Sequence, residues 1–258
     1  MASAIIGGLV KSGHAPDAVL VIDPGAAQRD KLHAEFGVRT LAAADATLAQ
    51  AALVVWAVKP QLFNAAAAPC AAFGAHALHL SVMAGIRSDA LVHATGTERI
   101  VRTMPNTPAL VGQGMTGLFA RAAVSAADRA QVEAVLAPTG QLMWVGREDL
   151  LDAVTAISGS GPAYVFYFVE AMTEAAVQMG LSAEQGNQLA LGTFAGATTL
   201  AQASPDAPNV LRERVTSKGG TTHAAITSLD ASGVKAAFIA AMQAAQERAR
   251  ELGDEFGR

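Results

Sequence analysis

The chain has 258 residues, of which 52% are hydrophobic, 16% charged and 5% aromatic, and its net charge is −4. This length suits one large domain or two smaller ones with a sizeable buried core. No basic block or basic stripe with interleaved aromatic residues occurs, which argues against a nucleic-acid partner. The low charge content indicates that part of the apolar surface lies in a subunit interface.

Three further features of the composition indicate a compartment. The single cysteine, Cys70, excludes an internal disulfide, suits a reducing compartment and is most simply a small core residue. Gly, Pro and polar residues interrupt each apolar run before it reaches membrane-spanning length. No cationic segment precedes an apolar stretch and a cleavage site. We therefore expect a cytoplasmic protein with no membrane partner.

The first half of the chain alternates between predicted helices and short apolar strands. The predicted helices are residues 1–13, 24–37, 44–51, 60–73 (with a kink or break at Pro69), 88–95 and 125–137. The predicted strands are residues 18–23, 38–43, 53–60, 76–83, 99–105, 114–120 and 141–146. This alternation predicts βαβ units and therefore a parallel sheet with helices on both faces.

Near Glu148 the pattern changes to helices alone, over residues 148–157, 162–180, 183–203, 208–215, 221–232 and 234–253. The helix after Pro162 is apolar on nearly every face, which predicts burial in a bundle or an interface. In the next helix, Gly192 and Gly196 let another helix approach closely. The sequence thus predicts a doubly wound, Rossmann-like α/β domain over residues 1–146 and a helical domain over residues 147–258.

The start of the α/β domain departs from the usual dinucleotide-binding pattern. Such a domain carries a G-x-G-x-x-G/A turn between its first strand and first helix. This chain opens in a predicted helix, and Gly7 and Gly8 lie inside its apolar run. Either the domain does not bind a dinucleotide, or its first strand and phosphate turn lie upstream of Met1. Composition does not separate these interpretations.

Asp23 ends the first predicted strand and is followed by Pro24. A carboxylate here is suited to accept hydrogen bonds from the adenosine ribose hydroxyls, which favours NAD over NADP. The same side chain is equally suited to cap the helix that begins at Pro24, and both roles are compatible.

Small or rigid polar loops follow three later strands, at the sheet edge where ligands usually bind. These loops are AVKP (57–60), SVMAG (81–85) and RTMPNTP (102–108). For a lysine such as Lys59 taken alone, an exposed charge at the end of a strand is the commoner case. Together, the three loops predict one wall of a binding site.

The segment VTSKGGTTHAAI (215–226) combines a lysine, two glycines and two threonines. A nucleotide P-loop is excluded because Lys218 precedes the glycines. Gly219 and Gly220 let the backbone approach a ligand closely. Thr221 and Thr222 begin a helix whose positive end suits an anion. An ordinary turn followed by a threonine helix cap is the alternative.

Several motifs together resemble the Δ1-pyrroline-5-carboxylate reductase family: AVKP (57–60), MAG (83–85), MPNTPAL (104–110), DLLDAVTAISGSGPAYVF (149–166) and VTSKGGTTHAAI (215–226). The resemblance runs from residue 1 to the C-terminal helix, and SGSGPAY with the TSxGGTT loop is specific. The chain departs from the family in lacking the strand and Gly-x-Gly turn before its first helix. Further departures are Lys218, where proline is common, and Ala44, where asparagine often contacts the cofactor.

The resemblance implies hydride transfer from NADPH or NADH to the C=N carbon of pyrroline-5-carboxylate, giving L-proline. It also implies a homodimer with interlocked helical domains, often assembled further into a decamer. No metal is needed for this chemistry. One alternative is a related imine or β-hydroxyacid dehydrogenase, which a lysine in the core of the helical domain would favour, but the helix after Pro162 contains none. The other alternative is an oligomer with impaired catalysis because the glycine turn is absent.

The resemblance also implies roles for individual residues. The substrate would be bound by Ser217, Gly219, Gly220, Thr221, Thr222 and Glu148, with Thr222 as the catalytic side chain that hydrogen-bonds the ring nitrogen. For Glu148, a solvated carboxylate is an equal alternative. His223 is disfavoured as a proton donor because helix geometry points it away from Thr222. The cofactor would be bound by Asp23, Ala57, Val58, Lys59, Pro60, Met83, Ala84, Gly85 and Asn106.

Overall fold

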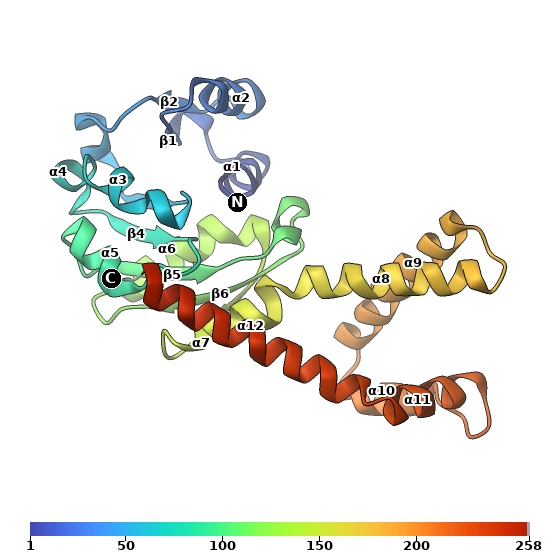
Figure 1. Cartoon of the computed structure of the whole chain (residues 1–258). Helices are drawn as coiled ribbons and strands as arrows, with labels where there is room; N and C mark the ends of the chain where they lie inside the picture. The colour runs from blue at the N-terminus through green and yellow to red at the C-terminus, as the bar shows by residue number, and fades with distance from the viewer. Residues whose placement is uncertain (257–258) are drawn as a thin grey trace. The chain divides into compact units, whose positions relative to one another are not determined.

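A computed structural model describes residues 1–256, and the chain divides into two compact units (Figure 1). Unit 1 comprises Met1–Gly161 and the chain from Ala244 onward, and unit 2 comprises Pro162–Gln243. The sequence-based boundary at residue 146 follows the change from strands to helices. The structural boundary between the units falls further along the chain, after Gly161, because residues 150–159 pack on the sheet of unit 1. The packing is close, since a Cβ at Gly117 in β6 would lie 2.7 Å from Val154 Cγ1.

Unit 1 contains two sheets. In the first, β1 (Leu20–Ile22) pairs in parallel with β2 (Arg39–Leu41). The second has the order β3-β4-β5-β6-β7 and consists of β3 (Leu53–Trp56), β4 (Leu78–Ser81), β5 (Ile100–Met104), β6 (Gly114–Ala120) and β7 (Gly140–Trp144).

The separation of the two sheets matches a Rossmann-like order that lacks its first strand. In that order the first strand lies between the second and the fourth. Here β1 and β3 take the second and fourth positions, and no strand within residues 1–256 pairs with both. Each therefore keeps one unpaired edge. The predicted fold class, a Rossmann-like α/β domain followed by a helical domain, is confirmed.

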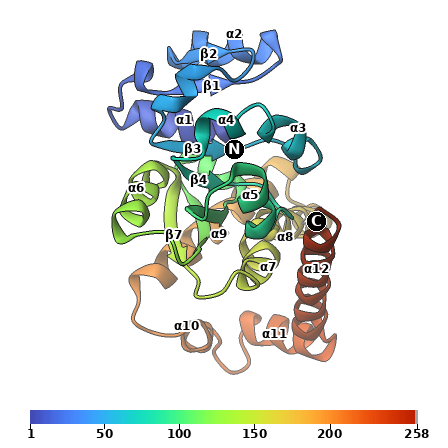
Figure 2. The same ribbon diagram turned by 90° about the vertical axis from the view of Figure 1, so that its left-hand side faces the viewer.

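Helices cover both faces of the five-stranded sheet (Figure 2). One face packs against α1 (Ala2–Lys11) and α6 (Ala126–Leu136) through a buried cluster that includes Ile5, Leu9, Leu78, Leu80, Val101, Val132 and Leu136. The other face packs against α3 (Phe63–Ala67), α4 (Ala71–Gly74) and α5 (Ser88–Thr95) through Trp56, Phe63, Cys70, Leu91 and Ile100. The break between α3 and α4 falls at Pro69, as predicted, and α2 (Ala26–Phe36) ends at Gly37 in the left-handed conformation.

The sheet differs from the prediction at one pair, because β5 and β6 are antiparallel. A parallel pair needs a crossover of a dozen or more residues. The connection between β5 and β6 spans only residues 105–113, which include the short 3₁₀ helix η4 (Thr107–Val111) and Gly112, whose φ is 70°. A tight reversal is therefore the arrangement that this connection allows.

The remaining short elements connect the larger ones. They are the 3₁₀ helices η1 (Pro16–Ala18), η2 (Ala46–Gln50), η3 (Pro60–Leu62) and η5 (Ala137–Thr139), the helix α7 (Leu150–Val154) and the π-helical turn η6 (Thr155–Gly159). Single π-helical turns are frequently found at functional sites. This one lies within the DLLDAVTAISGSGPAYVF motif (149–166), and its last two residues begin SGSGPAY.

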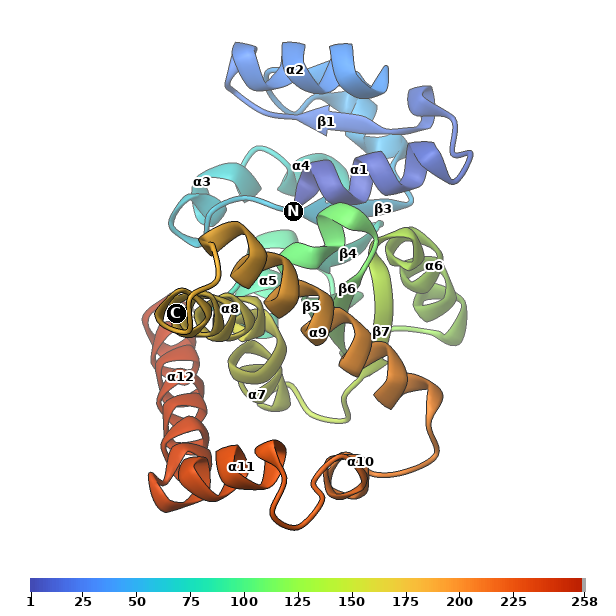
Figure 3. The same ribbon diagram turned by 90° about the vertical axis from the view of Figure 1, so that its right-hand side faces the viewer.

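Unit 2 is helical (Figure 3). It contains α8 (Gly161–Gln178, from Pro162 onward), α9 (Ala183–Ala203), α10 (Pro208–Arg214), α11 (Thr221–Ala231) and the first part of α12 (Val234–Phe256). Gly186 lets α9 approach α8, because a Cβ there would lie 2.8 Å from Ala176 Cβ. A Cβ placed on Gly192 or Gly196 would meet no atom of residues 1–256 within 4 Å, so the close approach predicted there is not made within this chain.

Large apolar side chains on α8 are exposed in the single chain. Phe166 is 57% exposed and Tyr167 is 67% exposed, whereas only Val169 and Ala176 are buried on this helix. Among the described residues, no single helix is long and apolar enough to cross a membrane, although α11 and α12, bent by 55°, pass that test as a pair by length and composition.

Candidate active site

The loops after β3, β4 and β5 meet at one edge of the sheet. The three strands are parallel, and Trp56, Ser81 and Arg102 are register partners. Their carboxyl ends therefore lie side by side. This brings together Ala57, Val58, Lys59 and Pro60 after β3, Met83, Ala84 and Gly85 after β4, and Asn106 after β5. The edge carries most of the predicted cofactor residues.

The Met83–Gly85 loop is firmly packed on one side. Met83 is 3% exposed and its N–H donates to Ser81 Oγ at 3.3 Å. Gly85 has a φ of 75°, and a Cβ there would lie 3.2 Å from the Leu252 carbonyl oxygen in α12. Ala84 between them is exposed. The loop therefore presents backbone and a methyl group to solvent while its ends are held.

Asp23 lies at the end of β1, in the two-stranded sheet. Its Oδ1 accepts from the Gly25 N–H at 2.8 Å, and Arg29 Nη1 donates to the Asp23 carbonyl oxygen at 2.7 Å. The N-cap of α2 is Gly25, with no side-chain cap. The helix-cap alternative for Asp23 is therefore wrong, and its carboxylate instead holds the turn that precedes the helix.

Asn106 joins the loop after β5 to the SGSG segment. Its Nδ2 donates to the carbonyl oxygen of Ser158 at 3.1 Å and to Ser158 Oγ at 3.2 Å. Its Oδ1 accepts from the Met115 N–H at 2.9 Å. Next to this contact, a Cβ at Gly159 would lie 2.7 Å from Met104 Cε, so only glycine leaves this packing undisturbed. Asn106 thus fixes the loop geometry whatever else it contacts.

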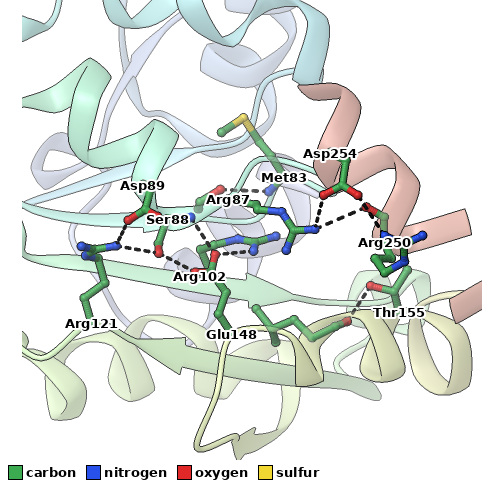
Figure 4. Close-up of polar contacts among 12 residues, drawn as sticks. Met83, Arg87, Ser88, Asp89, Arg102, Arg121, Glu148, Thr155, Arg250 and Asp254 are labelled. Atoms are coloured by element: carbon green, nitrogen blue, oxygen red, sulfur yellow. Dashed lines mark hydrogen bonds and ion pairs between the residues drawn. The ribbon is translucent and has the colours of Figure 1, made fainter. Parts of the chain in front are cut away.

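Glu148 lies in a polar network with Ser88 and Arg102 (Figure 4). Its Oε1 accepts from the Ser88 N–H at 2.6 Å and from Arg102 Nη1 at 2.5 Å, and its Oε2 accepts from Ser88 Oγ at 2.6 Å. Burial raises the pKa of Glu148, but the Ser88 hydrogen bonds and the Arg102 charge outweigh it, so the net pKa is lowered. The carboxylate is therefore charged at neutral pH, and both of its oxygens have protein partners.

The sequence analysis singled out Glu148 but did not identify Ser88 and Arg102 as its partners. Arg102 has a side chain only 8% exposed, in the middle of a largely buried strand. A buried arginine needs a carboxylate partner. That requirement was the available signal, but it does not say which of the chain's acidic residues is the partner.

The 215–222 segment belongs to unit 2, so the structure groups the predicted residues into two sets. Gly219 has a φ of 79°, and the Gly220 N–H donates to the Ser217 carbonyl oxygen at 3.0 Å. Gly220 is the N-cap of α11, with no side-chain cap. The alternative that a threonine caps this helix is therefore wrong. Thr221 and Thr222 occupy the first two helical positions.

The start of α11 provides the features of an anion site. The first N–H groups of a helix have no intrahelical acceptor, and the helix dipole places partial positive charge there. Ser217 and Thr221 are exposed, and Thr222 is half-buried. Backbone N–H groups and hydroxyls are thus available within one short segment, which suits a carboxylate.

The segment GQGMTG (112–117) has the residue spacing of the dinucleotide-binding motif but does not join a strand to a helix. Gly112, Gly114 and Gly117 have the G-x-G-x-x-G spacing, but they lie in the reversal into β6 rather than between a strand and a helix. A Cβ at Gly114 would lie 2.7 Å from the Thr139 carbonyl oxygen. These glycines therefore serve strand packing and leave no helix N-terminus for a phosphate.

Comparisons with known proteins agree with this geometry. Residues 148–252 match the family model for pyrroline-5-carboxylate reductase dimerisation, and residues 1–85 match that for NADP oxidoreductase, coenzyme F420-dependent. A pyrroline-5-carboxylate reductase of Pseudomonas aeruginosa is 43% identical over 259 residues, covering 100% of this chain and 95% of that protein. The chain belongs to the pyrroline-5-carboxylate reductase family.

Solved structures of family members have the same fold. A pyrroline-5-carboxylate reductase from Coxiella burnetii superposes with a TM-score of 0.90 at 34% identity, covering 97% of this chain and 94% of that one. A Plasmodium falciparum pyrroline carboxylate reductase with NADP bound has a TM-score of 0.82 at 27% identity, covering 97% of this chain and 96% of that one. The resemblance predicted from the motifs is confirmed.

Proposed function

We propose that the chain reduces 1-pyrroline-5-carboxylate to L-proline, the last step of proline biosynthesis. The observation that carries this proposal is the match to the Pseudomonas aeruginosa enzyme, which covers this chain completely at 43% identity. The related imine or β-hydroxyacid dehydrogenase is disfavoured because three relatives that are 35–43% identical over at least 98% of the chain are pyrroline-5-carboxylate reductases.

The cofactor is NADPH or NADH, which supplies the hydride when bound. The strand-end edge suits it, because the exposed Ala84 presents only backbone and a methyl group to a flat ligand. We assign cofactor contacts to Asp23 at the ribose, to residues 57–60 and 83–85 along the edge, and to Asn106. Asp23 favours NADH, since a carboxylate accepts from ribose hydroxyls and repels a 2′-phosphate.

The substrate carboxylate is assigned to the start of α11. Ser217, Gly219, Gly220 and Thr221 place hydroxyl and N–H donors at the positive end of that helix, and Glu148 is the further predicted substrate contact. The Thr222 hydroxyl is assigned to the ring nitrogen. A hydrogen bond there orients the ring and stabilises the nitrogen as its electron density changes. Solvent supplies the proton of the product amine.

We assign dimerisation to the helical region, residues 147–258. An apolar α8 with Phe166 and Tyr167 exposed needs a covering partner. Open space beside Gly192 and Gly196 suits a close helix from a second copy. We propose a homodimer, with a decamer as the larger assembly, in the cytoplasm. Residues 1–146 form the cofactor domain.

The direct test follows NADPH and NADH oxidation with pyrroline-5-carboxylate and quantifies proline by amino-acid chromatography. The expected result is proline formed in equal amount to cofactor oxidised. A six-membered cyclic imine and a β-hydroxyacid with NAD⁺ serve as comparison substrates. Faster turnover of either comparison substrate would favour the alternative dehydrogenase and contradict the proposal.

A further inference from the structure

The end of α12 packs against the loop that follows β4 (Figure 4). We infer that Arg87 and Asp254 are positioning residues that latch α12 to this loop and hold Met83–Gly85 in its cofactor-binding shape. The inference rests on the proposed function in one respect, namely that Met83–Gly85 contacts NAD(P)H. Both residues lie in unit 1, as does the loop.

Arg87 makes the polar part of the latch. Its Nη2 donates to Asp254 Oδ1 at 2.9 Å and to the Arg250 carbonyl oxygen at 3.4 Å. Asp254 Oδ2 accepts in turn from Arg250 Nη1 at 3.1 Å, which fixes the carboxylate. A cation near the C-terminal end of a helix is favoured by the helix dipole. The Arg87 guanidinium, which follows the cofactor loop, therefore interacts favourably with the last turns of α12 as well as with Asp254.

Two glycines allow the loop and α12 to pack closely, Gly85 in the loop and Gly253 in the helix. A Cβ at Gly85 would lie 3.2 Å from the Leu252 carbonyl oxygen and 3.4 Å from the Phe256 ring. A Cβ at Gly253 would lie 2.8 Å from Arg87 Nη2. Glycine weakens a helix relative to alanine, so its use at 253 needs a compensating reason. Room for the Arg87 guanidinium is that reason.

A second anchor holds the same loop at the next residue. The Ser88 N–H and hydroxyl both donate to Glu148, at 2.6 Å each. Ile86, between the loop and these anchors, is 2% exposed. Neighbouring residues 87 and 88 are thus tied to elements far away in sequence. A loop held in this way loses less conformational freedom when a ligand binds, which strengthens binding.

The ion pair itself is partly exposed, with side-chain exposures of 29% for Arg87 and 50% for Asp254. Pairs of this kind add little to global stability. The latch therefore predicts a local effect on loop order and cofactor affinity, with a small effect on the melting temperature.

The test compares Arg87→Ala, Asp254→Asn and Gly253→Ala with wild type. Arg248→Ala is the matched control, because Arg248 lies on the same helix and forms its ion pairs with Glu251 and Glu255 within that helix. Hydrogen exchange over residues 82–91 is measured without ligand. The Kd for NADPH, the KM for NADPH, kcat and the KM for pyrroline-5-carboxylate are measured on the same preparations.

The three latch variants should exchange faster over residues 83–88 and bind NADPH roughly three- to tenfold more weakly, as expected for one lost charge-assisted hydrogen bond. The kcat at saturating NADPH and the KM for pyrroline-5-carboxylate should stay near wild type. Adding Gly253→Ala to Arg87→Ala should have no further effect, since the glycine makes room for the arginine.

Latch variants that match Arg248→Ala in both exchange and NADPH affinity would overturn the inference, as would faster exchange with unchanged affinity. Wild-type protein that binds NADPH but forms no proline would contradict the proposed function instead. Because Asp254→Asn and Gly253→Ala change few atoms, they keep the test valid if Arg87→Ala does not fold.

Discussion

The carboxylate of Glu148 accepts hydrogen bonds from both the backbone N–H and the hydroxyl of Ser88, across 60 residues of sequence. Glu148→Gln removes the charge that pairs with Arg102 and leaves the buried guanidinium without a counter-ion. We expect a loss of about 1–3 kcal/mol in the free energy of unfolding, below the range for a fully buried pair because solvent reaches the side chain. Urea denaturation at pH 7 measures this loss.

The pH dependence of the same variant follows from the lowered pKa of Glu148. The folded pKa is below the ordinary value of 4.5, so the stabilisation is complete above that value and is lost as pH falls through the folded pKa. The difference between Glu148→Gln and wild type should therefore shrink on acidification below about pH 4.5. A deficit that is constant down to pH 3 would contradict a charge-based role. Glu251→Gln, at an exposed pair on α12, is the control.

Thr222 is the side chain assigned to the ring nitrogen. Thr222→Ala should lower kcat on the order of 10²-fold, the cost of one hydrogen bond that strengthens in the transition state. Thr222→Ser keeps the hydroxyl and should retain most of the activity. The control is Thr227→Ala, an exposed position on the same helix. Unchanged kcat in Thr222→Ala would remove this residue from the mechanism.

Gly220 sets the shape of the assigned carboxylate site. A Cβ there would lie 2.8 Å from Ser217 Oγ, so Gly220→Ala should displace that hydroxyl and raise the KM for pyrroline-5-carboxylate about tenfold. The KM for NADPH should not change. Gly146→Ala is the matched control, because a Cβ at Gly146 meets no atom of the described residues within 4 Å. Equal KM values for the two variants would argue against carboxylate binding at this segment.

Asp23 is assigned to the cofactor ribose. Asp23→Ser removes the acceptor and its repulsion of a 2′-phosphate, so the ratio of kcat/KM for NADH over NADPH should fall about tenfold. Asp17→Ser, at an exposed position before β1, should leave the ratio unchanged. A ratio that is the same in Asp23→Ser and wild type would show that Asp23 serves only the turn at Gly25.

Local signals in the sequence predicted most of the elements of this fold. The helices α5, α6 and α9 match their predicted ranges to within a residue. A serine caps the start of α6 and of α9, and Gly96 ends α5, so each range has a local boundary signal. The direction of β6 was missed because it depends on a connection too short for a crossover, which propensity alone does not reveal.

Contacts between distant segments were harder to predict. The ends of neighbouring parallel strands must meet, so the clustering of residues 57–60, 83–85 and 106 follows from topology. The pairing of Glu148 with Ser88, and of Arg87 with Asp254, depends on which side chains face each other after folding. Residue type and spacing do not determine such pairs, because many acidic residues are available for each arginine.

The central claim is that the 215–222 segment binds the substrate and that the loops after β3, β4 and β5 bind NAD(P)H, so that this chain reduces pyrroline-5-carboxylate. Within residues 1–256, β1 and β3 each have one edge that pairs with no other strand. The most direct measurement is NADPH and NADH oxidation with pyrroline-5-carboxylate, on this chain and on one extended before Met1 by a strand and a Gly-x-Gly turn. We predict proline formation by both chains, with tighter cofactor binding by the extended chain than by the 258-residue chain, because the turn supplies N–H groups for the pyrophosphate. No proline from either chain would contradict the claim.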